Sequence, residues 1–123
     1  MTSSERGRLG EARVISELVK KGWYPFIDIS GKCPVDIVAW KDGQTVTIQV
    51  KSSTVLDKNG KWVVQIGATR SNKTSNVVKN FDNTAQEYLA IHLSIPDVVV
   101  FVKSDTVTTK REFQVDQARA SDL

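Results

Sequence analysis

Apolar residues near the N-terminus recur with the period of an α-helix. The repeat consists of Val14, Ile15, Leu18 and Val19. Gly22 follows the last of them and is a typical residue at which a helix ends. The pattern predicts a helix over residues 8–21, and we expect the polar segment 1–7 before it to be flexible.

One acidic residue falls on the apolar side of this helix. Glu11 precedes Ile15 by four residues and Leu18 by seven, so all three lie on one face. A carboxylate there is costly unless it is paired or binds a metal. A partly exposed glutamate favoured by the helix dipole is the alternative, and the helix pattern alone leaves both open.

Two β-rich runs flank Asp42-Gly43 and predict a hairpin, because both residues of such a turn need positive φ. With this turn, Asp36 lies opposite Gln49. Side chains alternate between the faces of a strand, so Lys51 shares the face of these two residues. The other face is apolar and predicts core positions at Ile37, Ala39, Val46, Ile48 and Val50.

Four further β-rich segments predict strands: residues 23–29, 62–68, 88–95 and 98–102. Pro25 in the first segment indicates a sheet edge or a bulge. We expect residues 54–56 to extend the strand of Lys51, and the segment 62–68 to complete a three-stranded meander with the hairpin. His92 is interpreted as solvent-facing or packed, and we expect residues 117–123 to be flexible.

Residues 69–80 break the apolar pattern and combine cations with Asn and Ser, without an acidic residue between them. Such side chains contact phosphates and base edges. A solvated loop is the alternative for this segment. For the arginines near the N-terminus, which could also contact phosphates, the alternative is a solvated basic face. The candidate DNA contacts are Arg8, Arg70, Asn72, Lys73, Asn76 and Lys79.

The composition fits a single globular domain over residues 1–123, with 40% hydrophobic and 25% charged residues. The chain has no apolar run long enough to span a membrane and no signal-peptide pattern. The single Cys33 excludes an internal disulfide and favours a cytoplasmic location. With one His as well, the sequence argues against a zinc site, and the net charge of +3 is compatible with nucleic acid.

The hairpin brings chemically useful groups together. A carboxylate from Asp36, an amide oxygen from Gln49 and an ammonium from Lys51 converge on one face. Oxygen ligands at this spacing suit a hard divalent cation such as Mg²⁺. A lysine beside them can orient a water or stabilise charge that develops on a phosphate. The alternative is a half-exposed hairpin with a cross-strand ion pair.

Two short motifs around this hairpin resemble those of the PD-(D/E)XK nuclease superfamily. Gln49-Val50-Lys51 is similar to its (D/E)-x-K element, with glutamine at the acidic position. Pro34-Val35-Asp36 is similar to its Pro-Asp element, with one additional residue, and Gly-Glu-Ala-Arg-Val around Glu11 looks like its first helix. The resemblance implies an α/β fold, in which a helix packs on a mixed, mostly antiparallel sheet.

The resemblance also implies an activity, the Mg²⁺-dependent hydrolysis of a DNA phosphodiester, with Mn²⁺ as a substitute. Asp36 would be the chief metal ligand, joined by the amide oxygen of Gln49 and the backbone carbonyl of Val50. Glu11 would hold the metal through a water or help to orient Lys51. Lys51 would position the attacking water and stabilise the transition state.

The small size, Gln49 and the stretch Arg-Ser-Asn-Lys-Thr-Ser-Asn at residues 70–76 look most like intron-encoded homing endonucleases of this superfamily. Such enzymes cut long sites in double-stranded DNA as oligomers, so the resemblance implies a homodimer or a higher homo-oligomer. Two alternatives stay open. One is a Holliday-junction resolvase, and the other is a non-cleaving DNA-binding or assembly module on the same fold.

Overall fold

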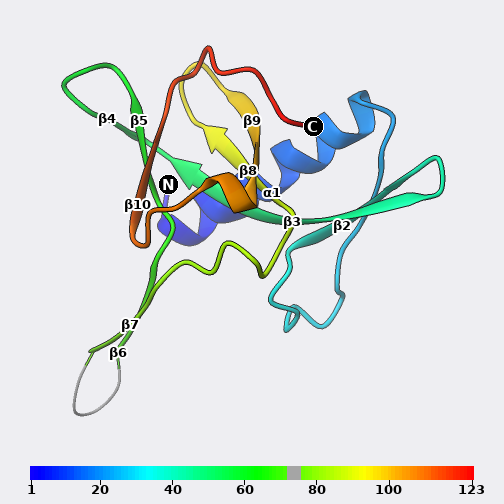
Figure 1. Cartoon of the computed structure of the whole chain (residues 1–123), viewed down its shortest axis with the longest axis horizontal. Coiled ribbons are helices and arrows are strands. Elements are labelled where there is room, and N and C mark those ends of the chain that lie inside the picture. Colours follow the sequence, from blue (N-terminus) through cyan, green and yellow to red (C-terminus); the bar gives the residue numbers. More distant parts are fainter. Residues whose placement is uncertain (72–75) are drawn as a thin grey trace.

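The computed structural model describes residues 1–71 and 76–123, and the side chains outside residues 68–78. The chain forms a helix, a five-stranded central sheet, a three-stranded smaller sheet and a two-stranded arm (Figure 1). The elements are α1 (Ser3–Lys20), β1 (Tyr24–Phe26), β2 (Ile37–Lys41), β3 (Gln44–Ser53), β4 (Val55–Leu56), β5 (Trp62–Gln65), β6 (Ala68–Ser71), β7 (Asn76–Lys79), β8 (Tyr88–Leu93), β9 (Val98–Lys103), the 3₁₀ helix η1 (Ser104–Thr106) and β10 (Glu112–Val115).

Helix α1 begins earlier than the apolar pattern predicts. Thr2 caps it, because the Thr2 Oγ1 atom accepts a hydrogen bond of 3.1 Å from the backbone N–H of Glu5. Thr2 and Glu5 have the spacing of a capping box, a signal that apolar periodicity does not contain. Residues 3–7 are therefore helical. The helix ends as predicted, with Gly22 at a φ of 85° just beyond it.

The central sheet has the strand order β1-β2-β3-β8-β9 and is antiparallel except where β3 pairs with β8. The fold class is therefore the predicted one, α/β with a mixed, mostly antiparallel sheet. The β2–β3 hairpin is also confirmed: Asp42 and Gly43 have φ values of 51° and 79°, and the register pairs Lys41 with Gln44. Pro25 lies on the edge strand β1 opposite Ala39, as its position in the sequence predicts, since proline in a sheet is tolerated on edge strands.

The predicted meander is wrong. Strand β3 ends at Ser53, and β4 and β5 form a separate sheet in the order β10-β5-β4. The place beside β3 belongs to β8, a parallel partner from much later in the chain. Within the segment 69–80, residues 69–71 and 76–79 form strands and not the loop considered for them, since β6 and β7 pair as an antiparallel arm. Residues 72–75 of that segment lie outside the described residues.

The two faces of the central sheet are covered by different elements. Val14 and Leu18 of α1 pack on one face against Ile37, Ile48 and Phe101. The smaller sheet covers part of the other face, with core residues that include Trp62, Val64, Leu89, Ile91 and Val115. The cleft described below opens where β3 leaves the central sheet, between these two coverings.

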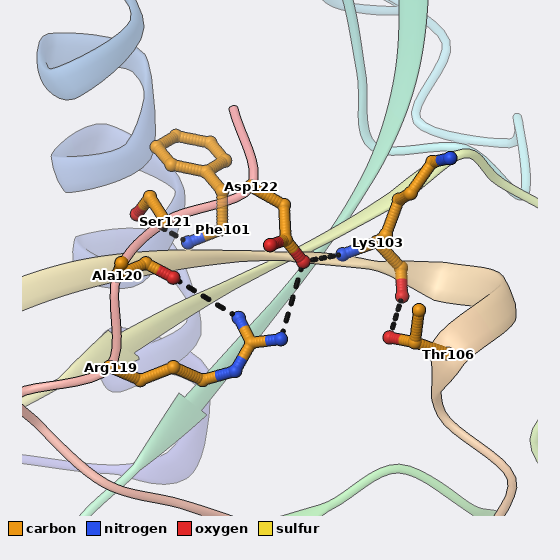
Figure 2. A network of polar contacts seen from close by, with 7 residues as sticks. All are labelled: Phe101, Lys103, Thr106, Arg119, Ala120, Ser121 and Asp122. Atoms are coloured by element: carbon orange, nitrogen blue, oxygen red, sulfur yellow. Dashed lines mark hydrogen bonds and ion pairs between the residues drawn. The ribbon is translucent and has the colours of Figure 1, made fainter.

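The C-terminal segment lies along β9 (Figure 2). Asp122 accepts a hydrogen bond of 2.8 Å from the Lys103 amide through Oδ2, and its own amide donates to the Phe101 carbonyl, also at 2.8 Å. The Ser121 hydroxyl oxygen accepts from the Phe101 amide at 3.1 Å. These bonds cover a sheet edge that would otherwise offer free backbone groups. The expected flexibility of residues 117–123 stays a prediction.

Within the described part of the chain, no helix is both long and apolar enough to cross a membrane.

Candidate active site

A cleft of about 660 Å³ lies between the N-terminal half of α1, the C-terminal half of β3 and the smaller sheet. The residues predicted for the site come from three places in the sequence, and all of them line this cleft: Glu11, Asp36, Gln49, Val50 and Lys51. The fold therefore brings together the groups that the sequence motifs indicate. Their catalytic and metal-binding roles stay predictions.

Asp36 lies immediately before β2, one position beyond the last ladder pair of the hairpin. Its Oδ2 atom accepts a hydrogen bond of 2.8 Å from the backbone amide of Val50. This bond fixes the direction of the carboxylate toward β3. No hydrogen bond to the Oδ1 atom occurs among the described residues, so that oxygen is available for a ligand.

Gln49 and Lys51 are half-buried neighbours on one face of β3. Burial lowers the pKa of the Lys51 ammonium, and the negative charge of Asp36 opposes this shift. The lysine is thus held in a partly dry environment beside a carboxylate. A cation in such a place acts more strongly on a neighbouring phosphate than it would in bulk water.

Glu11 faces the cleft from α1 instead of lying in the apolar core. Partial burial raises the pKa of its carboxyl group, and the nearby charge of Asp36 raises it further. Two carboxylates therefore repel each other across the cleft. A bound cation would relieve this repulsion.

The donor atoms fit a hard divalent cation. No group of three His, Cys, Asp or Glu side chains gathers anywhere in residues 1–71 or 76–123. A site with more than two protein ligands would therefore need the amide oxygen of Gln49 or the carbonyl of Val50. Carboxylate, amide and carbonyl oxygens are the ligands that Mg²⁺ accepts, which is consistent with the predicted ligand set.

The loop that leads into Asp36 is organised by Asp28, a residue that the motifs do not include. Its carboxylate accepts bonds from the amides of Ser30 at 3.0 Å and Cys33 at 3.0 Å, and from the Ser30 hydroxyl at 2.6 Å. These hydrogen bonds lower the pKa of Asp28 to about 2. The Asp-x-Ser sequence is a known turn signal and is the feature that could have revealed this loop.

A second unpredicted feature ties α1 to the turn between β8 and β9. The Asp97 Oδ1 atom lies 2.6 Å from Nε2 of the buried His92 and 3.0 Å from Nε of Arg13. Two hydrogen bonds lower the pKa of Asp97: the larger effect comes from His92 and the smaller from Arg13. Of the two alternatives for His92, the packed one is correct. No local signal reveals this network, because Arg13 and Asp97 are far apart in the sequence.

The candidate DNA contacts lie in different places. Lys79, at the end of the arm, shares a small cavity of about 200 Å³ with Gln49 and Lys51. Arg8 is exposed on α1, whereas Arg6 lines the main cleft. The backbones of Arg70 and Asn76 belong to β6 and β7, but their side chains lie outside those described, and Asn72 and Lys73 lie outside the described residues altogether.

Comparisons with known proteins agree with this geometry. Residues 1–121 match the family model described as PD-(D/E)XK endonuclease. The fold is similar to that of a bacterial homing endonuclease, I-Ssp6803I, with a TM-score of 0.83 and 19% sequence identity; the match covers 100% of this chain and 84% of that one. At this identity the structural likeness concerns the fold. A comparison with curated proteins finds no match.

Proposed function

Because this chain belongs to the PD-(D/E)XK endonuclease family, we propose that it is a Mg²⁺-dependent, site-specific endonuclease that hydrolyses phosphodiester bonds in duplex DNA. The single observation that carries the proposal is the convergence of Glu11, Asp36, Gln49 and Lys51 in one cleft. The likeness of the fold to that of a homing endonuclease supports site-specific cutting as the form of this activity.

The residues of the cleft would have two kinds of role: most would bind the metal, and Lys51 would supply a positive charge to the reaction. Asp36 would hold Mg²⁺ with its free oxygen, together with the amide oxygen of Gln49, the carbonyl of Val50 and, directly or through water, Glu11. The metal, when bound, would neutralise the phosphate and lower the pKa of its water, and Mn²⁺ would serve as a substitute. Lys51 would orient the attacking water and stabilise the charge of the transition state.

The arm formed by β6 and β7 is the proposed DNA-reading element. A two-stranded β-ribbon fits the major groove of duplex DNA. Lys79 of the arm lines a cavity together with Gln49 and Lys51, so a duplex bound by the arm would lie beside the cleft. We assign phosphate contacts to Arg70, Lys73 and Lys79 and base contacts to Asn72 and Asn76, with Arg8 as a further contact on α1.

The salt dependence of binding tests this assignment. Lys79→Ala should weaken binding and reduce the slope of log affinity against log salt by about 0.9 for the lost phosphate contact. The control is Lys20→Ala. Lys20 is an exposed cation at the C-terminal end of α1, whereas the cleft is lined by the N-terminal half of that helix, so its loss should leave the slope unchanged. Equal slopes in the two variants would move the DNA surface away from the arm.

Double-strand cutting has a consequence for assembly. One active site cuts one strand at a time, so cutting both strands of a linear site favours at least two copies of the chain, and closed symmetry is the common arrangement. We therefore propose a homodimer or a higher homo-oligomer on double-stranded DNA. Sedimentation of the protein with and without duplex would give the number of copies.

The decisive experiment is a cleavage selection from a random duplex library in Mg²⁺, with the chelator EDTA as the control. The selected linear duplex then competes with a four-way junction of unrelated sequence. Preferential cutting of the duplex supports the proposal, and base substitutions within the site should cost about 1–3 kcal/mol each in binding. Symmetric nicking of the junction, whatever its sequence, would identify a resolvase. DNA binding without cleavage in Mg²⁺ or Mn²⁺ would identify a non-cleaving module.

A further inference from the structure

Gly7 lies in the interior of α1, where glycine weakens a helix relative to alanine. Packing within the described chain does not require it. A Cβ atom built at Gly7 would have no heavy atom within 4 Å, whereas a Cβ at Gly10 would collide with the Ser52 hydroxyl. Gly10 is thus explained by its contact with β3, and no contact among the described residues explains Gly7.

The open surface at Gly7 belongs to the cleft. Gly7 lies about one helical turn before Glu11, and both residues line the cleft together with Arg6. The opposite wall comes from β5, through Val63 and Gln65, and Lys51 lies on β3 between the two walls. The bare stretch of helix therefore faces the space that leads to the proposed catalytic groups.

Arg6 gives this wall a positive charge. One guanidinium nitrogen, Nη1, donates to the Met1 carbonyl at 2.9 Å. A guanidinium has five N–H groups, so several donors are left for a phosphate. Arg13, by contrast, is engaged with Asp97. Along this wall, a cation and an unobstructed helix surface thus lie next to each other.

We propose that this wall of α1 binds the sugar–phosphate backbone of the cleaved DNA strand beside the scissile phosphate. Arg6 binds a phosphate of the strand. Because Gly7 has no side chain, the strand can lie close to the helix and reach Lys51 in the same cleft. The inference rests on the proposed endonuclease function and adds to it the surface against which the strand lies. A volume of about 660 Å³ lies within the usual range of ligand sites, about 300–1,000 Å³.

The test uses substitutions at one helix position that change folding and binding in opposite directions. Gly7→Ala should raise the thermal midpoint by about 3 °C, because alanine is the better helix former. It should nevertheless weaken duplex binding, and Gly7→Leu should weaken it by about tenfold or more, the effect of one lost contact. Arg6→Gln should reduce the salt slope of binding by about 0.9.

Ser16→Ala is the matched control. Ser16 is exposed on the same helix, does not line the cleft, and lies on the side of the helix opposite Gly7. Its replacement should raise the thermal midpoint and leave DNA binding and cleavage at wild-type values. Binding is measured by gel shift with the full chain in EDTA, and cleavage in Mg²⁺, so that the two readouts are independent.

The outcomes separate this inference from the proposed function. Wild-type binding and cleavage by Gly7→Leu would overturn the inference and leave the endonuclease assignment intact. A wild-type protein that binds duplex but never cleaves it would overturn the endonuclease assignment, while weaker binding by Gly7→Leu would still support the DNA-facing wall. A wild-type protein that binds no DNA would overturn both.

Discussion

The Asp36 carboxylate accepts a hydrogen bond of 2.8 Å from the backbone amide of Val50. This bond joins the residue before β2 to β3 at the point between Gln49 and Lys51. The three candidate groups are thereby held as one unit on the hairpin. Rigid support of this kind preserves the geometry of a site when one of its side chains is replaced.

Replacement of Lys51 tests whether its role is chemical. Lys51→Ala and Lys51→Met should each lower the single-turnover cleavage rate by about 10²-fold or more, because the charge that stabilises the transition state is lost. The Met variant keeps the apolar stem of the side chain. Duplex affinity and the thermal midpoint should stay near wild type. Near wild-type cleavage by both variants would exclude Lys51 from the reaction.

Gln49 should act as a neutral metal ligand. Gln49→Glu adds a third carboxylate to the cleft and should keep the activity while lowering the Mg²⁺ concentration needed for half-maximal cleavage. Gln49→Leu has a similar size and no oxygen, so cleavage should be lost. The measurement is a Mg²⁺ titration of the cleavage rate at fixed duplex. Wild-type activity in the Leu variant would show that position 49 binds no metal.

Local signals in the sequence were sufficient to predict the hairpin and the residues on the polar face of the site. Asp42-Gly43 determines the turn, the turn determines the register, and the register places Asp36 near Gln49. The pairing of β3 with β8 was not predictable in this way. It depends on which distant strand pairs with the free edge of β3, and the apolar alternation within β3 carries no information about that partner.

Contacts between distant residues explain a second difference between the predicted and the observed structure. The network of Arg13, His92 and Asp97 forms only after α1 has packed against the sheet, so no spacing in the sequence indicates it. The start of α1 is a different case, since Thr2 and Glu5 carry a local capping signal that a search for apolar periodicity overlooks. The network thus depends on tertiary packing, whereas the start of the helix is encoded locally in Thr2 and Glu5.

Asp97 should make the stability of the fold depend on acid pH. Its pKa is lowered in the folded protein, so its contribution is present above the ordinary value of 3.8 and is lost as the pH falls below that value through the folded pKa. Asp97→Asn should lower the thermal midpoint at neutral pH and flatten its decline in acid. Asp105→Asn, at an exposed carboxylate, is the control. A parallel decline in wild type and Asp97→Asn would contradict this role.

The contact between Gly10 and Ser52 should control how closely α1 approaches β3. A Cβ at position 10 would collide with the Ser52 Oγ atom but would lie 3.6 Å from the Ser52 Cβ, an ordinary contact. Gly10→Ala should therefore destabilise the protein by about 1–3 kcal/mol through overpacking. Among the described residues, the buried Ser52 Oγ has no hydrogen-bond partner. Ser52→Ala should consequently be neutral or slightly stabilising.

The double variant isolates this contact from other effects on the helix. Gly10→Ala combined with Ser52→Ala removes the colliding oxygen and should recover most of the lost stability, with a coupling energy of about 0.5–3 kcal/mol. Urea unfolding of the four proteins in the cycle gives that energy directly. Gly7→Ala places the same substitution on the same helix and should stabilise, because its Cβ meets nothing. Additive effects of the two substitutions would show that α1 shifts to accept the methyl group and that Gly10 does not determine its distance from β3.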